Sequence, residues 1–169
     1  MKTINVNGLS VLLKDGVVVS DDIYRFYRMF NIINSYLGKV YVTQLKGSGV
    51  HSTGIAIDLG CKNDLKSLYE IWNILPKYGF SCFIADKGAG TGLHLHVQDD
   101  GRGRKGVEVN RDGKSVFTYD YNNNYIASLY GASGIPGGNN SFNAGITNKE
   151  VFIYIIVAIL ILLGLSRWN

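Results

Sequence analysis

The residues able to do chemistry lie in two short segments of the chain. The first contains His51 and Asp58, and the second contains His94 and His96. The chain has three histidines, and all of them fall in these two segments. A lone histidine is most simply a structural residue, but three histidines and an aspartate in two apolar segments predict one shared metal site.

The first segment places a carboxylate on a short apolar strand. In the strand predicted over 55–59, aliphatic residues share one face, while Asp58 shares the other face with Ala56. Because a carboxylate buried alone is costly, Asp58 needs a cation, a hydrogen-bond donor or a metal ion beside it. His51 lies in the preceding loop, and the small residues Gly54 and Ala56 leave space around the carboxylate.

The second segment repeats this alternation. The leucine and valine side chains of residues 93–98 point to one side of the predicted strand, and those of His94, His96 and Gln98 point to the other. Two imidazoles therefore project side by side from a strand whose back belongs to the core.

Ligands of these types predict a catalytic zinc ion rather than a structural one. Three ligands of N, N and O type leave the fourth tetrahedral position free for water. Zinc lowers the pKa of such a water towards ~7, which supplies a hydroxide able to attack an amide carbonyl. Calcium would require more oxygen ligands than these residues offer.

The same two segments carry a family resemblance. The motif His51-x-x-Gly54-x-Ala56-x-Asp58, followed by His94-x-His96, resembles the zinc peptidase superfamily that unites lysostaphin-type endopeptidases, D-Ala-D-Ala carboxypeptidases and the hedgehog signalling domain. The likeness is strongest to M15-like peptidoglycan peptidases, including those used by phages as endolysins. It extends over residues 41–98 and is fairly specific, since two separated motifs occur in the right order.

This resemblance implies a small α+β domain that cuts cross-links or stem peptides of the bacterial cell wall. Carried over by position, His51, Asp58 and His96 would be the zinc ligands. His94 would be a histidine that supports the metal ligands from outside or the catalytic histidine, and would handle protons and steady the oxyanion.

Two positions depart from the family pattern. Many relatives carry a glutamate as general base three positions before the last histidine, where this chain has Leu93, and a serine often stands at the position of Gly49. Without the glutamate, either His94 does the work of the base or the activity is weak. Asp86 is an alternative base, and a different alignment would make His94 a ligand in place of His96.

Periodicity and turn signals predict the elements that position these residues. They are a hairpin over 4–13, a helix over 21–37 capped by Ser20, strands over 40–45, 55–59, 80–85 and 93–98, a helix that begins after Asn63 or Asp64 and ends at Gly79, and a hairpin over 107–119. Short interleaved strands and helices predict an α+β fold, with a small mainly antiparallel sheet and two packed helices.

The composition changes near residue 131. We predict a zinc peptidase-like domain over 1–130, a Gly/Asn/Ser-rich linker over 131–148 and a transmembrane anchor over 149–169. Residues 151–166 contain no charged residue, and Lys149 and Arg167 flank them. A hydrophobic oligomerisation helix is the alternative. The N-terminus lacks the apolar run of a signal peptide, so we expect the domain to begin on the side of the membrane where it is made.

Several other features are expected to be ordinary. The formal charge of +4 does not call for a nucleic acid partner, and Cys61 and Cys82 are expected to be free thiols packed as small apolar residues. The glycine-rich loop 88–92 leads into a strand and lacks the ending of a phosphate-binding loop, so we interpret it as a mobile wall of the cleft. The basic stretch 101–106 is either a solvated loop or a contact for anionic polymers or lipid headgroups.

The metal-site pattern, together with what the family resemblance implies, predicts a zinc-dependent peptidase that cleaves peptide bonds in peptidoglycan, in cell wall lysis or remodelling or as a virion-associated lysin. Its partners would be a peptidoglycan peptide and a membrane bound through the C-terminal helix. That membrane would be the bacterial inner membrane or the membrane of a virion. The alternative is a non-catalytic, membrane-anchored structural or binding module on the same scaffold.

Overall fold

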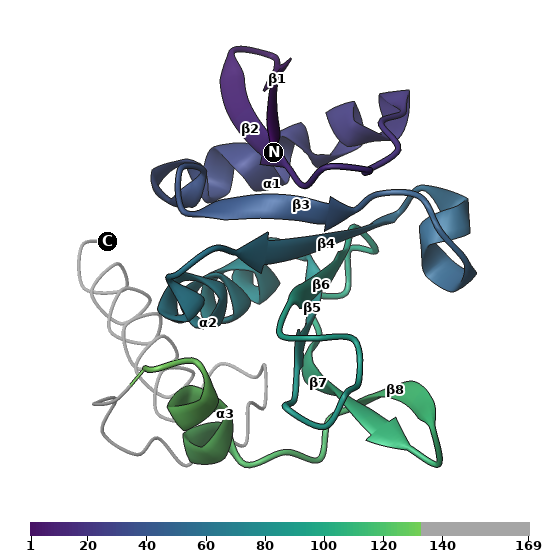
Figure 1. The fold of residues 1–169 in the computed structure, drawn as a ribbon, viewed down its shortest axis with the longest axis vertical. Coiled ribbons are helices and arrows are strands. Elements are labelled where there is room, and N and C mark those ends of the chain that lie inside the picture. The colour runs from purple at the N-terminus through teal and green to yellow at the C-terminus, as the bar shows by residue number, and fades with distance from the viewer. Residues whose placement is uncertain (133–169) are drawn as a thin grey trace, which may run out of the picture. The chain divides into compact units, whose positions relative to one another are not determined.

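The computed structural model describes residues 1–132, which form one eight-stranded sheet with helices packed against it (Figure 1). The strands are β1 (Lys2–Val6), β2 (Leu9–Leu13), β3 (Val40–Gln44), β4 (Ala56–Cys61), β5 (Ser81–Ala85), β6 (Leu95–Gln98), β7 (Lys105–Arg111) and β8 (Lys114–Thr118). The α-helices are α1 (Tyr27–Ile32), α2 (Leu65–Ile74) and α3 (Asn123–Leu129). Four short 3-10 helices complete the set: η1 (Asp21–Phe26), η2 (Asn34–Tyr36), η3 (Gly49–Thr53) and η4 (Leu75–Tyr78).

The sheet is mainly antiparallel. Its strand order is β1-β2-β3-β4-β6-β5-β7-β8, and only the β2–β3 and β5–β7 pairs are parallel. The α+β class and the predominantly antiparallel sheet are therefore confirmed. The order also places β6 between β4 and β5, so that strands far apart in sequence become neighbours at the centre of the sheet.

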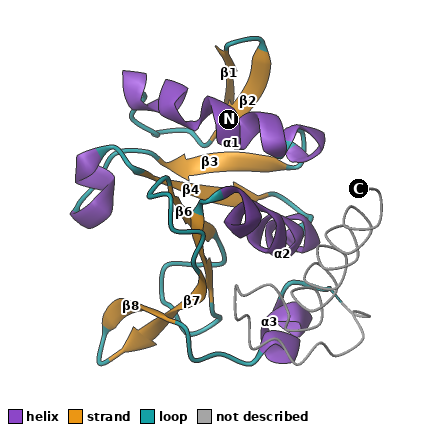
Figure 2. Cartoon of the chain, turned by 180° about the vertical axis from the view of Figure 1, so that it is seen from behind, coloured by secondary structure: helices purple, strands orange, loops and turns teal. Residues whose placement is uncertain are grey.

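A single hydrophobic core joins the helices to one face of the sheet. The buried members include Val42, Ile57, Leu59, Ile84, Leu95, Val97 and Val107 from the strands, with Phe26, Phe30, Leu68, Ile71 and Trp72 from the helices. Figure 2 shows α1 beside β3, and α2 beside β4 and β6. Because side chains alternate along a strand, the residues between these core positions project from the opposite face, and this face carries the candidate site.

The segment 21–37 does not form the single amphipathic helix predicted for it. It is divided into η1, α1 and η2, and the Ser20 hydroxyl donates to Asp22 rather than capping a helix. Ile23, Phe26, Met29, Phe30 and Ile33 are all buried, a spacing of three and four residues that suits an α-helix or a chain of 3-10 turns. Aromatic and β-branched residues favour a continuous helix only weakly, so packing decides the backbone.

The second predicted helix is confirmed in its start, but it is divided into α2 and the 3-10 helix η4, whose C-cap is Gly79, and a third helix was not foreseen. Asp64 caps α2 by accepting a hydrogen bond from the Ser67 backbone N–H. Helix α3 was missed, so the expected pair of packed helices is incomplete. The Tyr130 hydroxyl, which follows α3, is buried and donates to the backbone oxygen of Ala85 (2.8 Å), which ties this end of the chain to the end of β5.

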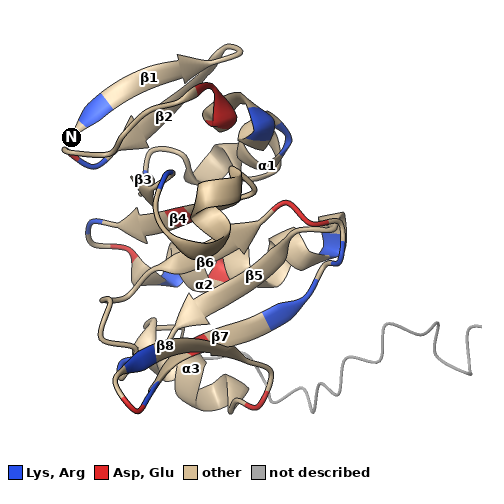
Figure 3. Cartoon of the chain, turned by 90° about the vertical axis from the view of Figure 1, so that its right-hand side faces the viewer, with Lys and Arg blue, Asp and Glu red and all other residues tan. Residues whose placement is uncertain are grey.

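The remaining predictions about the described residues concern thiols and charge. Cys61 and Cys82 are both free, with Cys82 buried and Cys61 half-buried, as expected. Figure 3 shows Lys and Arg on several elements rather than gathered on one.

Among residues 1–132, no helix combines the length and the apolar character needed to cross a membrane. The predicted linker, apart from its first two residues, and the predicted anchor over 149–169 lie outside the described residues.

Candidate metal centre

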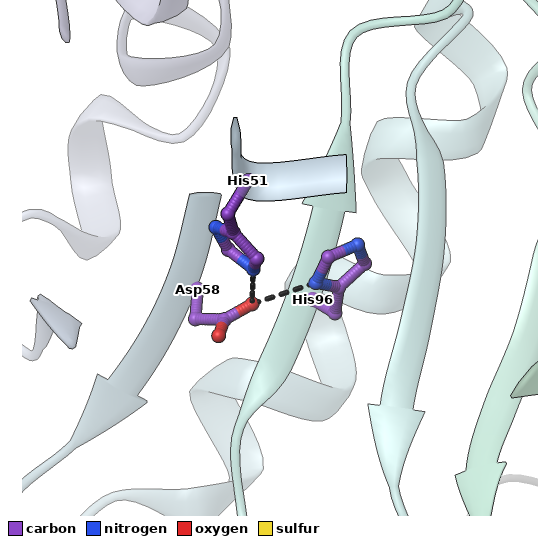
Figure 4. Close-up of side chains that lie close together, drawn as sticks. All are labelled: His51, Asp58 and His96. Atoms are coloured by element: carbon purple, nitrogen blue, oxygen red, sulfur yellow. Dashed lines mark hydrogen bonds and ion pairs between the residues drawn. The ribbon is translucent and has the colours of Figure 1, made fainter. Parts of the chain in front are cut away.

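Three elements bring His51, Asp58 and His96 together at the centre of the sheet (Figure 4). Asp58 on β4 lies directly opposite His96 on β6 in the antiparallel register, and His51 reaches them from η3. Asp58 Oδ1 lies 2.7 Å from His96 Nδ1 and 3.2 Å from His51 Nε2. Opposite residues of an antiparallel pair hold their side chains within contact distance, so the strand register itself creates half of this cluster.

Gly54 explains how η3 presents His51. It ends η3 in the left-handed conformation (φ +71°), and its backbone N–H donates to the His51 carbonyl. A Cβ atom at this position would lie 2.7 Å from Asp22 Oδ1. Asp22 is held in place by an ion pair with Lys46. The glycine of the motif is therefore required both by its backbone conformation and by the side chain packed against it.

The cluster is buried and polarised around one carboxylate. His51, Asp58 and His96 are exposed to only 6%, 8% and 3%. Burial by itself raises the pKa of Asp58, but hydrogen bonds from His51 and His96 hold it well below its usual value, so the carboxylate is ionised.

Such a group could hold a metal ion. One ligand atom from each residue lies within 4.8 Å of the others, and the two imidazole nitrogens and one carboxylate oxygen match the donors that zinc accepts. His51 Nδ1 is buried and has no hydrogen-bond partner within the described part of the chain, which leaves Nε2 as the nitrogen directed at the cluster.

His94 does not join this cluster but lies in the same cleft. It precedes β6 by one residue, so the strand predicted over 93–98 begins later than expected. Its Nε2 lies 2.9 Å from Glu108 Oε2, and its Nδ1 lies 2.9 Å from the backbone oxygen of Gly92. Of the two alignments left open by the sequence, this arrangement favours His96 over His94 as the ligand beside Asp58.

Two acceptors around one imidazole favour its protonated form. Burial lowers the pKa of His94, but the hydrogen bond to Glu108, the charge of Asp58 and the Gly92 carbonyl together raise it to about 9. His94 is therefore an imidazolium at neutral pH in the metal-free protein, with one N–H directed at each acceptor.

Glu108 is the carboxylate that the sequence interpretation missed. It lies on β7, is buried, and accepts hydrogen bonds from His94, Ser115 and Thr91. Burial raises its pKa, but the bonds from His94 and Ser115 outweigh this and lower it. The available signal was its position between Val107 and Val109, the same apolar flanking that singled out Asp58.

Asp86, the alternative base, is not part of the cleft. Its Oδ1 accepts the Gly88 backbone N–H at 2.8 Å, which is an ordinary loop interaction. Within the described part of the chain, Glu108 lines the cleft and Asp86 does not. Of the two carboxylates, Glu108 is therefore the one that lies in the cleft.

The cleft around these groups has a volume of about 760 Å³. His51, Asp58, His94, His96 and Glu108 line it, together with Tyr41, Thr43, Gln44, Ser48, Thr91, Gly92, Ser115 and Phe117. The presence of Thr91 and Gly92 confirms that part of loop 88–92 forms a wall of the cleft.

The basic stretch 101–106 is not simply a solvated loop, because Arg104 is half-buried and donates hydrogen bonds to Asp100 and Ser81.

Comparisons with protein family models, with characterised proteins and with solved structures found no match. The resemblance to zinc peptidases therefore rests on the two sequence motifs.

Proposed function

We propose that this chain is a zinc-dependent peptidase that cleaves peptide bonds in bacterial peptidoglycan. The observation that carries the proposal is the buried cluster of His51, Asp58 and His96 in a cleft that also holds the His94–Glu108 pair. A structural zinc site uses four protein ligands, whereas three ligands at the floor of a cleft leave a position for water or substrate.

His51 Nε2, Asp58 Oδ1 and His96 Nδ1 are the atoms that would hold the ion. When bound, zinc supplies Lewis-acid activation of a water nucleophile and of the scissile carbonyl. The ionised state of Asp58 suits a cation, because the carboxylate does not have to lose a proton before it binds one.

His94 and Glu108 supply the proton chemistry in this proposal. When one N–H of the His94 imidazolium exchanges its acceptor, Glu108 or Gly92, for the substrate, it can donate a hydrogen bond to a developing oxyanion and a proton to the leaving amine. Glu108 stabilises the imidazolium and fixes the orientation of the ring through the 2.9 Å contact. With zinc bound by His51, Asp58 and His96, charge repulsion would lower the pKa of His94 from the value of about 9 in the metal-free protein, towards the range useful for catalysis at neutral pH.

The substrate and the location are proposed from the sequence. The motifs resemble those of peptidoglycan peptidases, and the cleft is large enough for a peptide segment rather than for a single small ion. The uncharged run 151–166 is proposed as a membrane anchor that keeps the enzyme near the cell wall, in a bacterial membrane or in a virion membrane.

The test combines metal content with cleavage. The purified full chain is assayed for bound zinc and for release of peptides from purified peptidoglycan, beside His96→Ala, His94→Ala and Asp86→Asn. We expect stoichiometric zinc and cleavage in the wild type, loss of both in His96→Ala, and loss of cleavage alone in His94→Ala. Asp86→Asn is the matched control and keeps both, because Asp86 lies outside the cleft.

Two other outcomes have definite meanings. Zinc binding without any cleavage would replace the peptidase by a non-catalytic binding module on the same scaffold. Absence of zinc from the wild-type chain, after incubation with zinc and removal of excess, would refute the metal centre itself.

A further inference from the structure

A buried polar chain lies behind His96, on the side away from Asp58. Gln98 follows His96 on the same face of β6 and is only 5% exposed. Its Nε2 lies 3.0 Å from His96 Nε2, and its Oε1 lies 3.4 Å from Arg104 Nη2. Arg104 is in turn fixed by Asp100 (2.6 Å) and by Ser81 (3.1 Å).

The strand register builds this chain in the same way as it builds the metal centre. Gln98 lies opposite Ala56 on β4 and opposite Ser81 on β5, two residues along from the Asp58–His96 pair and on the same face of the sheet. Ala56 is too small to fill the space beside the amide. The side chain of Gln98 therefore extends between His96 and Arg104, where both of its polar atoms are used.

In the metal-free protein the donors and acceptors agree. His96 Nδ1 carries the proton and donates to Asp58, so its Nε2 has a free lone pair. Gln98 Nε2–H donates to that lone pair, and Gln98 Oε1 accepts from Arg104. From Asp58 through His96 and Gln98 to Arg104, each donor therefore faces an acceptor.

An ion bound to His96 Nδ1 would exchange the donor and acceptor roles of the two ring nitrogens. The Nδ1 lone pair is then used for the ion, so the remaining ring proton lies on Nε2 and needs an acceptor. Rotation of the Gln98 amide supplies such an acceptor without moving the backbone, because it turns Oε1 towards His96. Arg104 then loses its contact with Gln98 Oε1 but keeps Asp100 and Ser81.

We propose that Gln98 is the positioning residue of the metal centre: it fixes the His96 ring and accepts the Nε2–H of His96 when the ion is bound. The proposal rests on the metal site of the proposed function, but it does not depend on peptidase activity. Histidines that bind metals in proteins are commonly held by such a hydrogen bond from the second ring nitrogen, and loss of this bond weakens metal affinity.

Zinc affinity of the full chain tests the proposal, measured by competition with a chromophoric chelator. Gln98→Met keeps the size of the side chain but removes the acceptor, and we expect the dissociation constant to rise roughly 10–100-fold. Gln98→Glu offers only acceptors and can also pair with Arg104, so we expect affinity at or above that of the wild type. The control is Asp86→Asn, which changes a polar side chain outside the cleft and should leave zinc affinity unchanged.

A spectroscopic measurement reports the tautomer directly. In the zinc-loaded wild type, histidine ring ¹⁵N shifts should place the His96 proton on Nε2, and in the metal-free form on Nδ1. Near-UV circular dichroism establishes that each variant is folded, and Gln98→Glu carries the test if Gln98→Met is not.

The failures of the two proposals are distinguishable. No zinc binding by the wild-type chain refutes the metal centre and the proposed function. Zinc binding that Gln98→Met leaves unchanged, or that Gln98→Glu weakens as much as Gln98→Met does, overturns the role of Gln98 alone.

Discussion

Two buried carboxylates, Asp58 and Glu108, have different partners although both lie on strands between apolar neighbours. Asp58 accepts from two imidazoles, and no hydroxyl or backbone donor competes for Oδ1 among the described contacts. Glu108 accepts from one imidazole and from the hydroxyls of Ser115 and Thr91. The first arrangement leaves a convergent set of metal-ligand atoms, whereas the second holds one charged imidazole in place.

The His94–Glu108 pair predicts a pH dependence for the stability of the metal-free chain. Folding raises the pKa of His94 from 6.5 to about 9, so the folded state binds the proton more tightly than the unfolded state. The resulting stabilisation, on the order of 3 kcal/mol, is fully present below about pH 6.5 and is lost as the pH rises through about 9. Urea unfolding in the presence of a chelator, followed by near-UV circular dichroism, measures it.

The control for this prediction isolates His94 from other groups. Burial and the nearby charge of Lys77 lower the pKa of Lys105 to about 8, so Lys105 makes stability rise with pH over part of the same range. The informative quantity is therefore the difference between the wild type and His94→Gln. If that difference does not shrink between about pH 6.5 and about pH 9.5, the ion pair contributes nothing to folding.

At the scale of elements, the site depends on how short segments end. The 3-10 helix η3 has only five residues, and its last hydrogen bond runs from Gly54 N–H to the His51 carbonyl. The left-handed conformation of Gly54 directs the chain into β4, which carries Asp58. The spacing between His51 and Asp58 is therefore set by the end of η3, by Gly54 and by the first residues of β4.

Gly54→Ala is expected to damage both stability and metal binding. The left-handed backbone costs a residue with a Cβ roughly 1–2 kcal/mol, and the new Cβ would also lie 2.7 Å from Asp22 Oδ1. Relief of that contact must move either Asp22 or the turn that holds His51. Thermal unfolding and zinc affinity of the full chain measure the two consequences.

Gly49→Ala is the matched control for Gly54→Ala. Gly49 also has a positive φ (+61°), but nothing lies within 4 Å of the position that its Cβ would take. Gly49→Ala therefore has the free-energy cost of a left-handed backbone but no close contact of the new Cβ with another side chain. We expect Gly54→Ala to be the more damaging of the two, and Asp22→Ala in the Gly54→Ala background to restore part of the zinc affinity. Equal effects of the two glycine substitutions would show that the contact with Asp22 is unimportant.

At the scale of the whole molecule, the three candidate ligands of one ion come from η3, β4 and β6. An ion bound to all three links elements that are separate in the unfolded chain. Because a ligand that binds only the folded state stabilises it, zinc at about 100 times its dissociation constant should add about 2.7 kcal/mol to the free energy of unfolding. The midpoint of thermal unfolding with and without zinc checks this.

The specificity of that stabilisation needs two controls. His96→Ala should unfold at the same temperature with and without zinc, because the site has lost a ligand. Calcium should not replace zinc in the wild type, because two nitrogen donors and one carboxylate suit a hard cation poorly. A gain in His96→Ala as large as in the wild type would place the stabilising zinc elsewhere in the chain.

Much of the fold was predictable because it depends on local patterns. The strands, the hairpins and the α2 helix with its Asp64 cap follow from alternation, turn residues and capping signals. The segment 21–37 was less predictable, since the same apolar spacing suits an α-helix or a chain of 3-10 turns. Helix α3 has only seven residues and a weak apolar pattern, so packing decides its existence.

The sequence by itself determined which residues could form a metal site. Alternation placed Asp58 and His96 on faces opposite to apolar residues, and the motif glycine marked the turn that carries His51. These are properties of neighbouring residues, which the order of the chain contains directly.

Only the tertiary structure decided which of those residues meet. The sheet order β4-β6-β5-β7 sets Asp58 beside His96, gives His94 its partner Glu108, and connects Gln98 to Arg104. None of these pairings follows from spacing, because strand neighbours are chosen by the burial of the whole apolar face against α1 and α2. The sequence therefore determines the faces of the strands, while the packing of the complete domain determines the contacts across them.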